Sequence, residues 1–114
     1  MSSPTTVPRP TSVVVVIGGP ADLVAATRLA AGVAAAARVE TAELATAATV
    51  IATNRPFAVV VSEDMYSFDA GEFNALARDV NAVLIRIDTA GATREKLERA
   101  LMPRLGRAHR RRDP

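Results

Sequence analysis

Four polar side chains with the potential for chemistry follow the apolar run at residues 57–61. They are Ser62, Glu63, Asp64 and Asp69. Carboxylate oxygens are the ligands that a hard divalent cation prefers, and a pair of carboxyl groups can also exchange protons with a substrate. No histidine, lysine or arginine lies close to them in the sequence. Because nothing nearby would activate a nucleophile, we interpret these residues as a solvated acidic loop.

A second candidate is the turn Gly18-Gly19-Pro20, which follows an apolar run and precedes a helical pattern. Free N–H groups at the start of a helix can bind anions. The spacing matches neither a dinucleotide-binding fingerprint nor a phosphate-binding P-loop. We therefore interpret the segment as a tight turn between a strand and a helix. A weak anion site stays open as an alternative, because open α/β folds place their ligands at this carboxyl edge of the sheet.

Three apolar side chains interrupt the polar segment after residue 61, namely Met65, Tyr66 and Phe68. Exposed aromatic residues are typical anchors of protein interfaces. The same side chains could instead fold under the segment and close the core. The sequence leaves both roles open.

Basic residues gather at the C-terminal end of the chain. Residues 1–93 hold six Arg and Lys against nine Asp and Glu, a net charge of −3, whereas residues 94–114 hold eight against three, a net charge of +5. The basic tail consists of Arg107, Arg110, Arg111 and Arg112. Such a cluster can contact the phosphates of a nucleic acid or an anionic lipid surface, but no aromatic residues are interleaved with it. We expect the tail to aid solubility or to dock on an acidic protein partner, and we do not expect nucleic-acid binding.

The composition excludes several classes of protein. The chain has no cysteine, which rules out disulfides, thiolate metal sites and cysteine nucleophiles. Residues 1–11 are rich in Ser, Thr and Pro and lack the apolar segment of a signal peptide, so we expect a disordered leader. The longest apolar run, residues 13–17, is far too short to cross a bilayer. These features predict a cytoplasmic protein with no membrane insertion.

Continuous apolar runs predict strands that are buried on both faces, as in the centre of a parallel sheet. These runs are residues 12–17, 57–61 and 82–87, and a shorter strand is expected at residues 38–40. Apolar residues at helical spacing predict helices over residues 23–34, 42–52, 71–80 and 94–107, with a loop at residues 62–70. Pro103 is expected to kink or end the last helix. The single histidine, His109, has no carboxylate neighbour, and we expect it to lie in a solvated tail at residues 108–114 without a catalytic role.

Strands and helices therefore alternate along the chain in the order βαβαβαβα. Short connections with this alternation require parallel strands joined by right-handed crossovers, with helices on both faces of the sheet. We predict a three-layer, doubly wound parallel α/β sheet of the flavodoxin and receiver type, with four strands in the order 2-1-3-4. One domain is expected, over residues 12–107.

Residues 48–73 resemble the third strand of bacterial receiver domains (response regulators) with the helix before it and the loop after it. Residues 54–73 of this stretch read NRPFAVVVSEDMYSFDAGEF. In that family a proline precedes an apolar strand, which ends in the phosphoacceptor aspartate and leads into a methionine-containing loop. Pro56 matches the family's proline, and Ser62 matches the phosphoacceptor. In the loop, Met65 matches the methionine, Tyr66 the proline and Asp69 the aspartate. The resemblance implies a flavodoxin-like fold and a part in signalling.

The residues that carry the family's chemistry are replaced. Receivers hold Mg²⁺ with an acidic pair after the first strand, where this chain has Gly18 and Gly19. Ser62 replaces the phosphoacceptor aspartate, and Ile87 replaces the switch Ser or Thr. The family's lysine on its fifth strand has no counterpart, because Lys96 lies in a predicted helix and no fifth strand is expected. Phosphoryl transfer needs a metal ion, a nucleophile and the family's lysine to stabilise its transition state, and the residues for all three are missing. We therefore expect no phosphorylation, no metal and no cofactor.

These observations predict a non-catalytic, receiver-like regulatory module that docks another protein or a second copy of itself. A small carrier or anion-binding α/β domain that uses the carboxyl edge is the alternative. Four-stranded carriers of the sugar phosphotransferase type need Cys or His after the first strand, where this chain has glycine. Nucleic-acid binding through the C-terminal arginines is a third and less favoured class.

Overall fold

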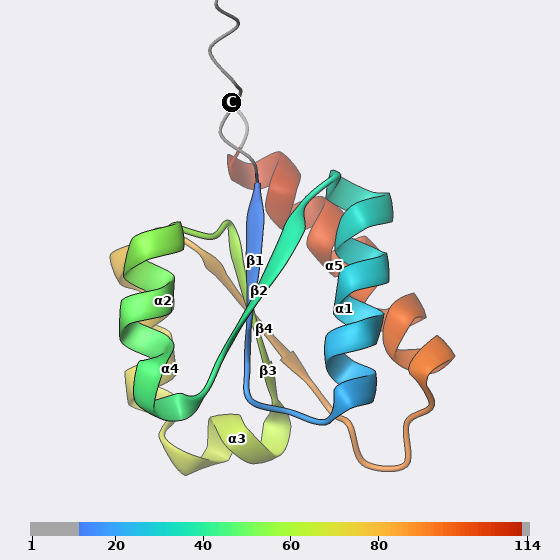
Figure 1. Ribbon diagram of the computed structural model, residues 1–114, viewed down its shortest axis with the longest axis horizontal. Coiled ribbons are helices and arrows are strands. Elements are labelled where there is room, and N and C mark those ends of the chain that lie inside the picture. Colours follow the sequence, from blue (N-terminus) through green and yellow to red (C-terminus); the bar gives the residue numbers. More distant parts are fainter. Residues whose placement is uncertain (1–11, 113–114) are drawn as a thin grey trace, which may run out of the picture.

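The computed structural model describes residues 12–112, so the leader predicted at residues 1–11 lies outside the described part of the chain, as do residues 113–114. Figure 1 shows strands and helices alternating around a central sheet. Their bounds are β1 (Val13–Ile17), α1 (Ala21–Ala35), β2 (Arg38–Ala42), the 3₁₀ turn η1 (Leu44–Thr46), α2 (Ala47–Asn54), β3 (Ala58–Ser62), α3 (Glu63–Phe68), α4 (Ala70–Asp79), β4 (Val83–Ile87) and α5 (Arg94–Arg112).

The sheet formed by the described residues is all-parallel, and its strand order is β2-β1-β3-β4. This confirms the predicted α/β fold, its parallel sheet and its strand order. Every residue of the two central strands, β1 and β3, is buried. Val15 pairs with Val59 of β3, which pairs in turn with Leu84 of β4. Continuous β-branched runs suit these positions because both faces of the sheet are covered.

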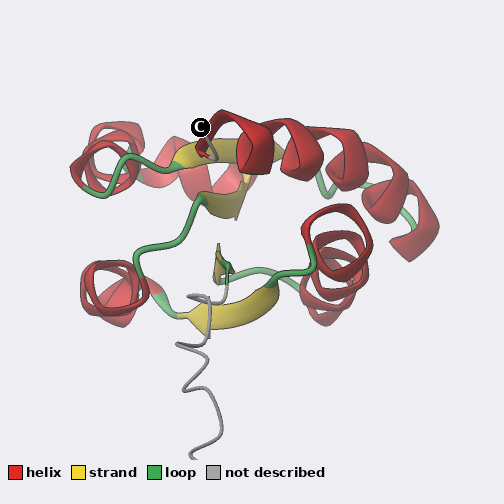
Figure 2. Ribbon diagram, turned by 90° about the horizontal axis from the view of Figure 1, so that it is seen from above, coloured by secondary structure: helices red, strands yellow, loops and turns green. Residues whose placement is uncertain are grey.

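Helices cover the two faces of the sheet and complete a three-layer structure (Figure 2). Helices α1 and α5 pack on one face, where Val14 and Leu101 belong to the same buried cluster. Helices α2 and α4 pack on the other face, where Val15 shares a buried cluster with Ile51 and Phe73. Since successive residues of a strand point to opposite faces, one run of valines supplies both halves of the core.

The prediction of a loop at residues 62–70 is wrong, because most of these residues are helical. Helix α3 begins after Ser62, whose Oγ accepts a hydrogen bond from the Met65 N–H at 3.2 Å. The acidic pair that follows Ser62 occupies the first turn, where carboxylates interact favourably with the helix dipole. Asp69 then caps α4 by accepting a hydrogen bond from the Glu72 N–H at 3.3 Å. The polar residues that suggested a loop are the start signals of two short helices.

Helix α5 continues through Pro103 to Arg112, so the helix does not end at the proline, and the solvated tail expected from residue 108 is wrong over the described residues. Pro103 is exposed, whereas Leu101, Leu105 and Ala108 are buried in the cluster shared with α1. A proline inside a helix costs about 3 kcal/mol. Full burial of one leucine side chain contributes about 1.5 to 3 kcal/mol. The apolar spacing on both sides of the proline therefore carries the helix through it.

The last turns of α5 lie against the amino ends of the central strands. His109 is half-buried, and its Nε2 lies 3.2 Å from the Ser12 Oγ. The His109 ring also meets the Phe57 ring edge-on, with centroids 5.1 Å apart. These contacts tie the C-terminal end of α5 to the segments that lead into β1 and β3.

Candidate functional site

The carboxyl ends of β1, β3 and β4 meet at one edge of the sheet, beside α3 (bottom of Figure 1). The loop after β1 and the segment after β3, both singled out in the sequence, come together here. A Cβ added to Gly18 would lie only 2.7 Å from the Met65 Cε of α3. The turn after β1 and the helix after β3 therefore pack against each other, and Met65 makes this contact apolar.

The turn at Gly18 and Gly19 has the backbone of a tight connection. Their φ angles are 60° and 94°, in the left-handed region that glycine adopts without a steric penalty. The Gly18 N–H donates to the Ala42 carbonyl at 2.7 Å, so it is not free for a ligand. The first turn of α1 carries Asp22, whose carboxylate would repel an anion at that helix end. This geometry fits a tight turn and gives an anion little to bind.

Ser62, on the position of the receiver phosphoacceptor, is buried and serves as the N-cap of α3. Its hydroxyl accepts the hydrogen bond from the Met65 N–H. Within residues 12–112 it forms no hydrogen bond with a histidine, lysine or carboxylate that would remove its proton. The hydroxyl is therefore a structural group in this fold, with nothing beside it to make it a nucleophile.

Glu63 is paired with an arginine that the sequence reasoning did not place at this edge. Arg86 of β4 donates from Nε and Nη2 to the two carboxylate oxygens of Glu63, at 3.0 and 2.9 Å. The hydrogen bond to Glu63 raises the pKa of Arg86, against a smaller opposing effect of desolvation. The guanidinium also lies over the Tyr66 ring, 4.0 Å from its centroid. A bidentate pair has a fixed geometry, so it ties α3 to the end of β4.

A signal for this pair was present in the strand sequence. Residues 83–87 read VLIRI, with one charged residue near the carboxyl end of an otherwise apolar run. A charged residue in a strand needs water or a partner, and at that position the partner must come from the carboxyl edge. Glu63 and Arg86 are 23 positions apart, so a search for neighbours in sequence missed the pair.

The three apolar residues of the predicted interface have different environments. Tyr66 stacks on Phe73 with ring centroids 6.4 Å apart, and its hydroxyl accepts a hydrogen bond from Asn74 Nδ2 at 2.9 Å. Met65 is half-buried and packs on the same core cluster. Phe68, by contrast, is 82% exposed. Met65 and Tyr66 therefore belong partly to the core, and Phe68 is the aromatic side chain that faces solvent.

The acidic residues of the carboxyl edge are dispersed among separate structural roles. Glu63 is bonded to Arg86, Asp69 caps α4, and Asp64 is exposed. Within residues 12–112, no three Asp, Glu or His side chains gather in a way that could hold a metal ion. The edge thus consists of internal hydrogen bonds with an exposed aromatic side chain beside them.

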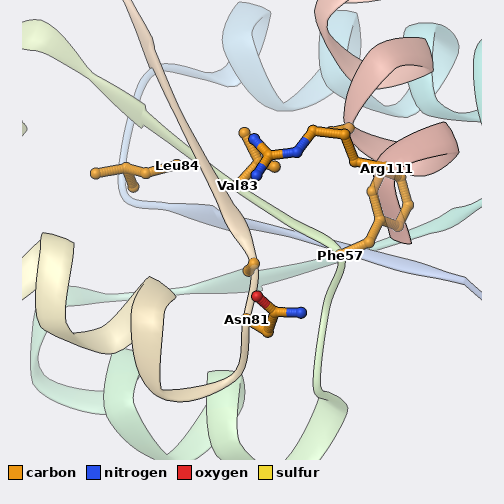
Figure 3. Close-up of a pocket in the computed structure, with 7 residues that line it drawn as sticks. Phe57, Asn81, Val83, Leu84 and Arg111 are labelled. Carbon is orange, nitrogen blue, oxygen red and sulfur yellow. The ribbon is translucent and has the colours of Figure 1, made fainter. Parts of the chain in front are cut away.

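The basic tail predicted from the sequence lies away from this edge, on the last turns of α5. Arg107, Arg110 and Arg111 are exposed there, and the helix ends at Arg112. Arg111 lines a cavity of about 280 Å³ beside the start of β4 (Figure 3), whereas Arg107 and Arg110 are not among its walls. The predicted residues therefore form two separate surfaces, one at each end of the sheet.

In the described part of the chain, no helix is long and apolar enough to cross a membrane. Comparisons with family models, with curated proteins and with solved structures found no significant match to this chain.

Proposed function

We propose that this chain is a non-catalytic, receiver-like interaction module that binds another protein, or a second copy of itself, through the α3 surface. We define the α3 surface as residues 63–68 together with Arg86. The observation that carries the proposal is the exposure of Phe68, an aromatic side chain that is 82% in solvent. Removing apolar surface from water contributes about 25 cal/mol per Å², so a partner that covers this ring gains binding energy.

The α3 surface is supported by rigid contacts. Tyr66 is stacked on the core residue Phe73, and the Glu63–Arg86 pair links the helix to β4. A surface that is already ordered loses little conformational entropy when a partner binds. Tyr and Arg are also the residue types that are enriched at binding hot spots. The residue types and their preorganisation both favour a docking role.

The same contacts weigh against catalysis and against a carrier role at this edge. The Ser62 hydroxyl is used as a helix cap, and the Gly18 N–H is bonded to a carbonyl. The Met65 methyl lies against the glycine turn, where an anion would need polar donors. A reaction at the carboxyl edge would therefore need groups that are already committed to the fold.

The test compares the full-length chain with Phe68→Ala. Self-association is measured by sedimentation velocity over a range of concentrations, and partner binding by affinity capture with quantitative mass spectrometry. Loss of a hot-spot side chain costs about 2 kcal/mol or more, so the variant should weaken the interaction by about thirtyfold. Val33→Ala is the matched control, because Val33 is 69% exposed on α1, away from the α3 surface.

The proposal requires that the control binds like the unchanged chain. If Phe68→Ala and Val33→Ala both retain full binding, the α3 surface is not the interface. If both lose binding equally, the interaction is non-specific adhesion of apolar side chains.

A further inference from the structure

Strand β4 has an open edge. It is the last strand in the order β2-β1-β3-β4, and its ladder joins it to β3. In a parallel ladder the backbone N–H and C=O groups of successive residues point alternately to the two sides. The Val83 N–H donates to the Phe57 carbonyl at 2.9 Å, so Val83 faces β3. Leu84 and Arg86 therefore direct their backbone groups away from the sheet.

Part of this open edge is already occupied. Arg104 of α5 donates from Nη1 to the Arg86 carbonyl at 2.7 Å, which blocks the carboxyl end of the edge. Before the strand begins, the Ala82 N–H donates to the Ala77 carbonyl at 2.8 Å. The N–H and C=O of Leu84 lie between these two positions. They are the donor and acceptor that an added strand would bond.

A cavity of about 280 Å³ lies along the same stretch of β4. Its walls are residues 81–84, Phe57, and Ala108 and Arg111 of α5. Figure 3 shows the Arg111 guanidinium beside Val83, with Asn81 at the start of the strand and Leu84 pointing the other way. The open backbone groups and the cavity thus occupy one place on the molecule, with a cationic side chain at its wall.

The charge of α5 decides between two possible occupants. Residues 104–112 contain five arginines and no acidic residue. Arg111 is exposed and is not one of the partners in the ion pairs of residues 12–112. A second copy of the chain on this edge would bring two such basic segments together, and like charges repel. The charge therefore favours an acidic occupant over self-pairing.

We propose that the open edge of β4 is a docking site for an extended acidic segment of a partner protein. The backbone of the segment pairs with the N–H and C=O of Leu84 as an added strand. A carboxylate side chain of the segment enters the cavity and bonds with Arg111. The sugar–phosphate backbone of a nucleic acid has phosphate oxygens but no N–H groups to bond the Leu84 carbonyl, so the backbone geometry favours a peptide. The site is distinct from the α3 surface and does not depend on it.

The probe is a displayed library of random nine-residue peptides, selected against the full-length chain. Enriched peptides should be acidic and rich in β-branched residues, which suit an added strand. On the ¹⁵N-labelled chain they should shift the amide signals of Asn81 and Leu84, and those of the last turns of α5. Phe68→Ala should bind the selected peptides normally, which separates this site from the proposed α3 interface.

Charge reversal tests the role of Arg111. Arg111→Glu should weaken the selected peptides by at least about tenfold, because a charge-assisted hydrogen bond is replaced by repulsion. Arg107→Glu makes the same charge change at an exposed position of α5 outside the cavity, and should change the affinity less than about threefold. Leu84→Pro removes the outward N–H without removing a bond to β3, and should also abolish binding if the chain stays folded.

Several results would overturn the docking site. A library that yields no enriched acidic peptide would do so, as would amide shifts that map to residues 63–68. Equal weakening by Arg111→Glu and Arg107→Glu would mean that the helix attracts anions without a specific site. Single-stranded DNA that gives the shifts at Leu84 and the dependence on Arg111 would assign the edge to nucleic acid instead.

Discussion

Tyr66 and Phe68 are close together on α3, yet replacing each with alanine should have opposite consequences. Tyr66 is half-buried, with its ring stacked on Phe73 and its hydroxyl bonded to Asn74. Phe68 is 82% exposed. Tyr66→Ala should therefore destabilise the fold, and Phe68→Ala should weaken binding while leaving the fold intact.

The expected magnitudes follow from these contacts. A stacked aromatic pair contributes about 0.5 to 1.5 kcal/mol, and the hydrogen bond to Asn74 contributes about 0.5 to 1 kcal/mol. The half-buried part of the Tyr66 ring adds about 1 kcal/mol of lost apolar burial. Tyr66→Ala should thus lower the free energy of unfolding by about 2 to 3.5 kcal/mol. Phe68→Ala should change it by less than about 0.5 kcal/mol, as is usual for surface positions.

Urea unfolding followed by far-UV circular dichroism measures both variants, since that signal does not depend on the tyrosine. With a slope of about 1.5 kcal/mol per M, Tyr66→Ala should lower the midpoint by about 1.5 M. Phe68→Ala should lower it by less than about 0.3 M. If Phe68→Ala shifts the midpoint as far as Tyr66→Ala, Phe68 is a core residue and the α3 surface is not available to a partner.

Four further predictions concern the backbone, the buried contacts and the missing phosphorylation chemistry. Gly32→Ala should raise the free energy of unfolding by about 1 kcal/mol and so raise the urea midpoint of the variant. Gly32 lies inside α1, and an added Cβ would meet nothing within 4 Å. Gly18→Ala should lower that midpoint, since the φ of Gly18 is +60° and the added Cβ would clash with Met65. His109→Ala should cost about 1 to 2 kcal/mol through its contacts with Ser12 and Phe57, and an unchanged melting curve would show that these contacts contribute nothing. Acetyl phosphate with Mg²⁺ should leave the mass of the full-length chain unchanged, whereas a phosphorylated species would contradict the structural role of Ser62.

The architecture could be predicted because it is recorded in local patterns. Continuous β-branched runs with helical segments between them are compatible with few arrangements other than a parallel sheet covered on both faces. The predicted strand at residues 57–61 and the observed β3, Ala58–Ser62, differ by one residue, because a strand ends where pairing ends. The strand order was confirmed because short right-handed crossovers allow few alternatives.

The prediction failed where a local preference competed with long-range packing. Pro103 favours a helix end, but α5 continues because Leu105 and Ala108 are buried against α1 and the sheet. The polar residues after β3 favour a loop, but Ser62 and Asp69 cap two short helices. In both cases the local signal was real, and its outcome depended on what lay next to the segment in space.

By itself, the sequence determined the fold class and the strand order, because periodicity and β-branching are properties of neighbouring residues. The tertiary structure decided which distant groups meet and which side chains face water. Glu63 meets Arg86 only because the carboxyl ends of β3 and β4 lie side by side. Tyr66 and Phe68 are both aromatic and close in sequence, yet one is stacked on Phe73 and the other is exposed. The sequence shows whether a residue is apolar or charged. The direction of its side chain on a short helix depends on how segments remote in sequence pack together. The open edge of β4 depends on the same packing.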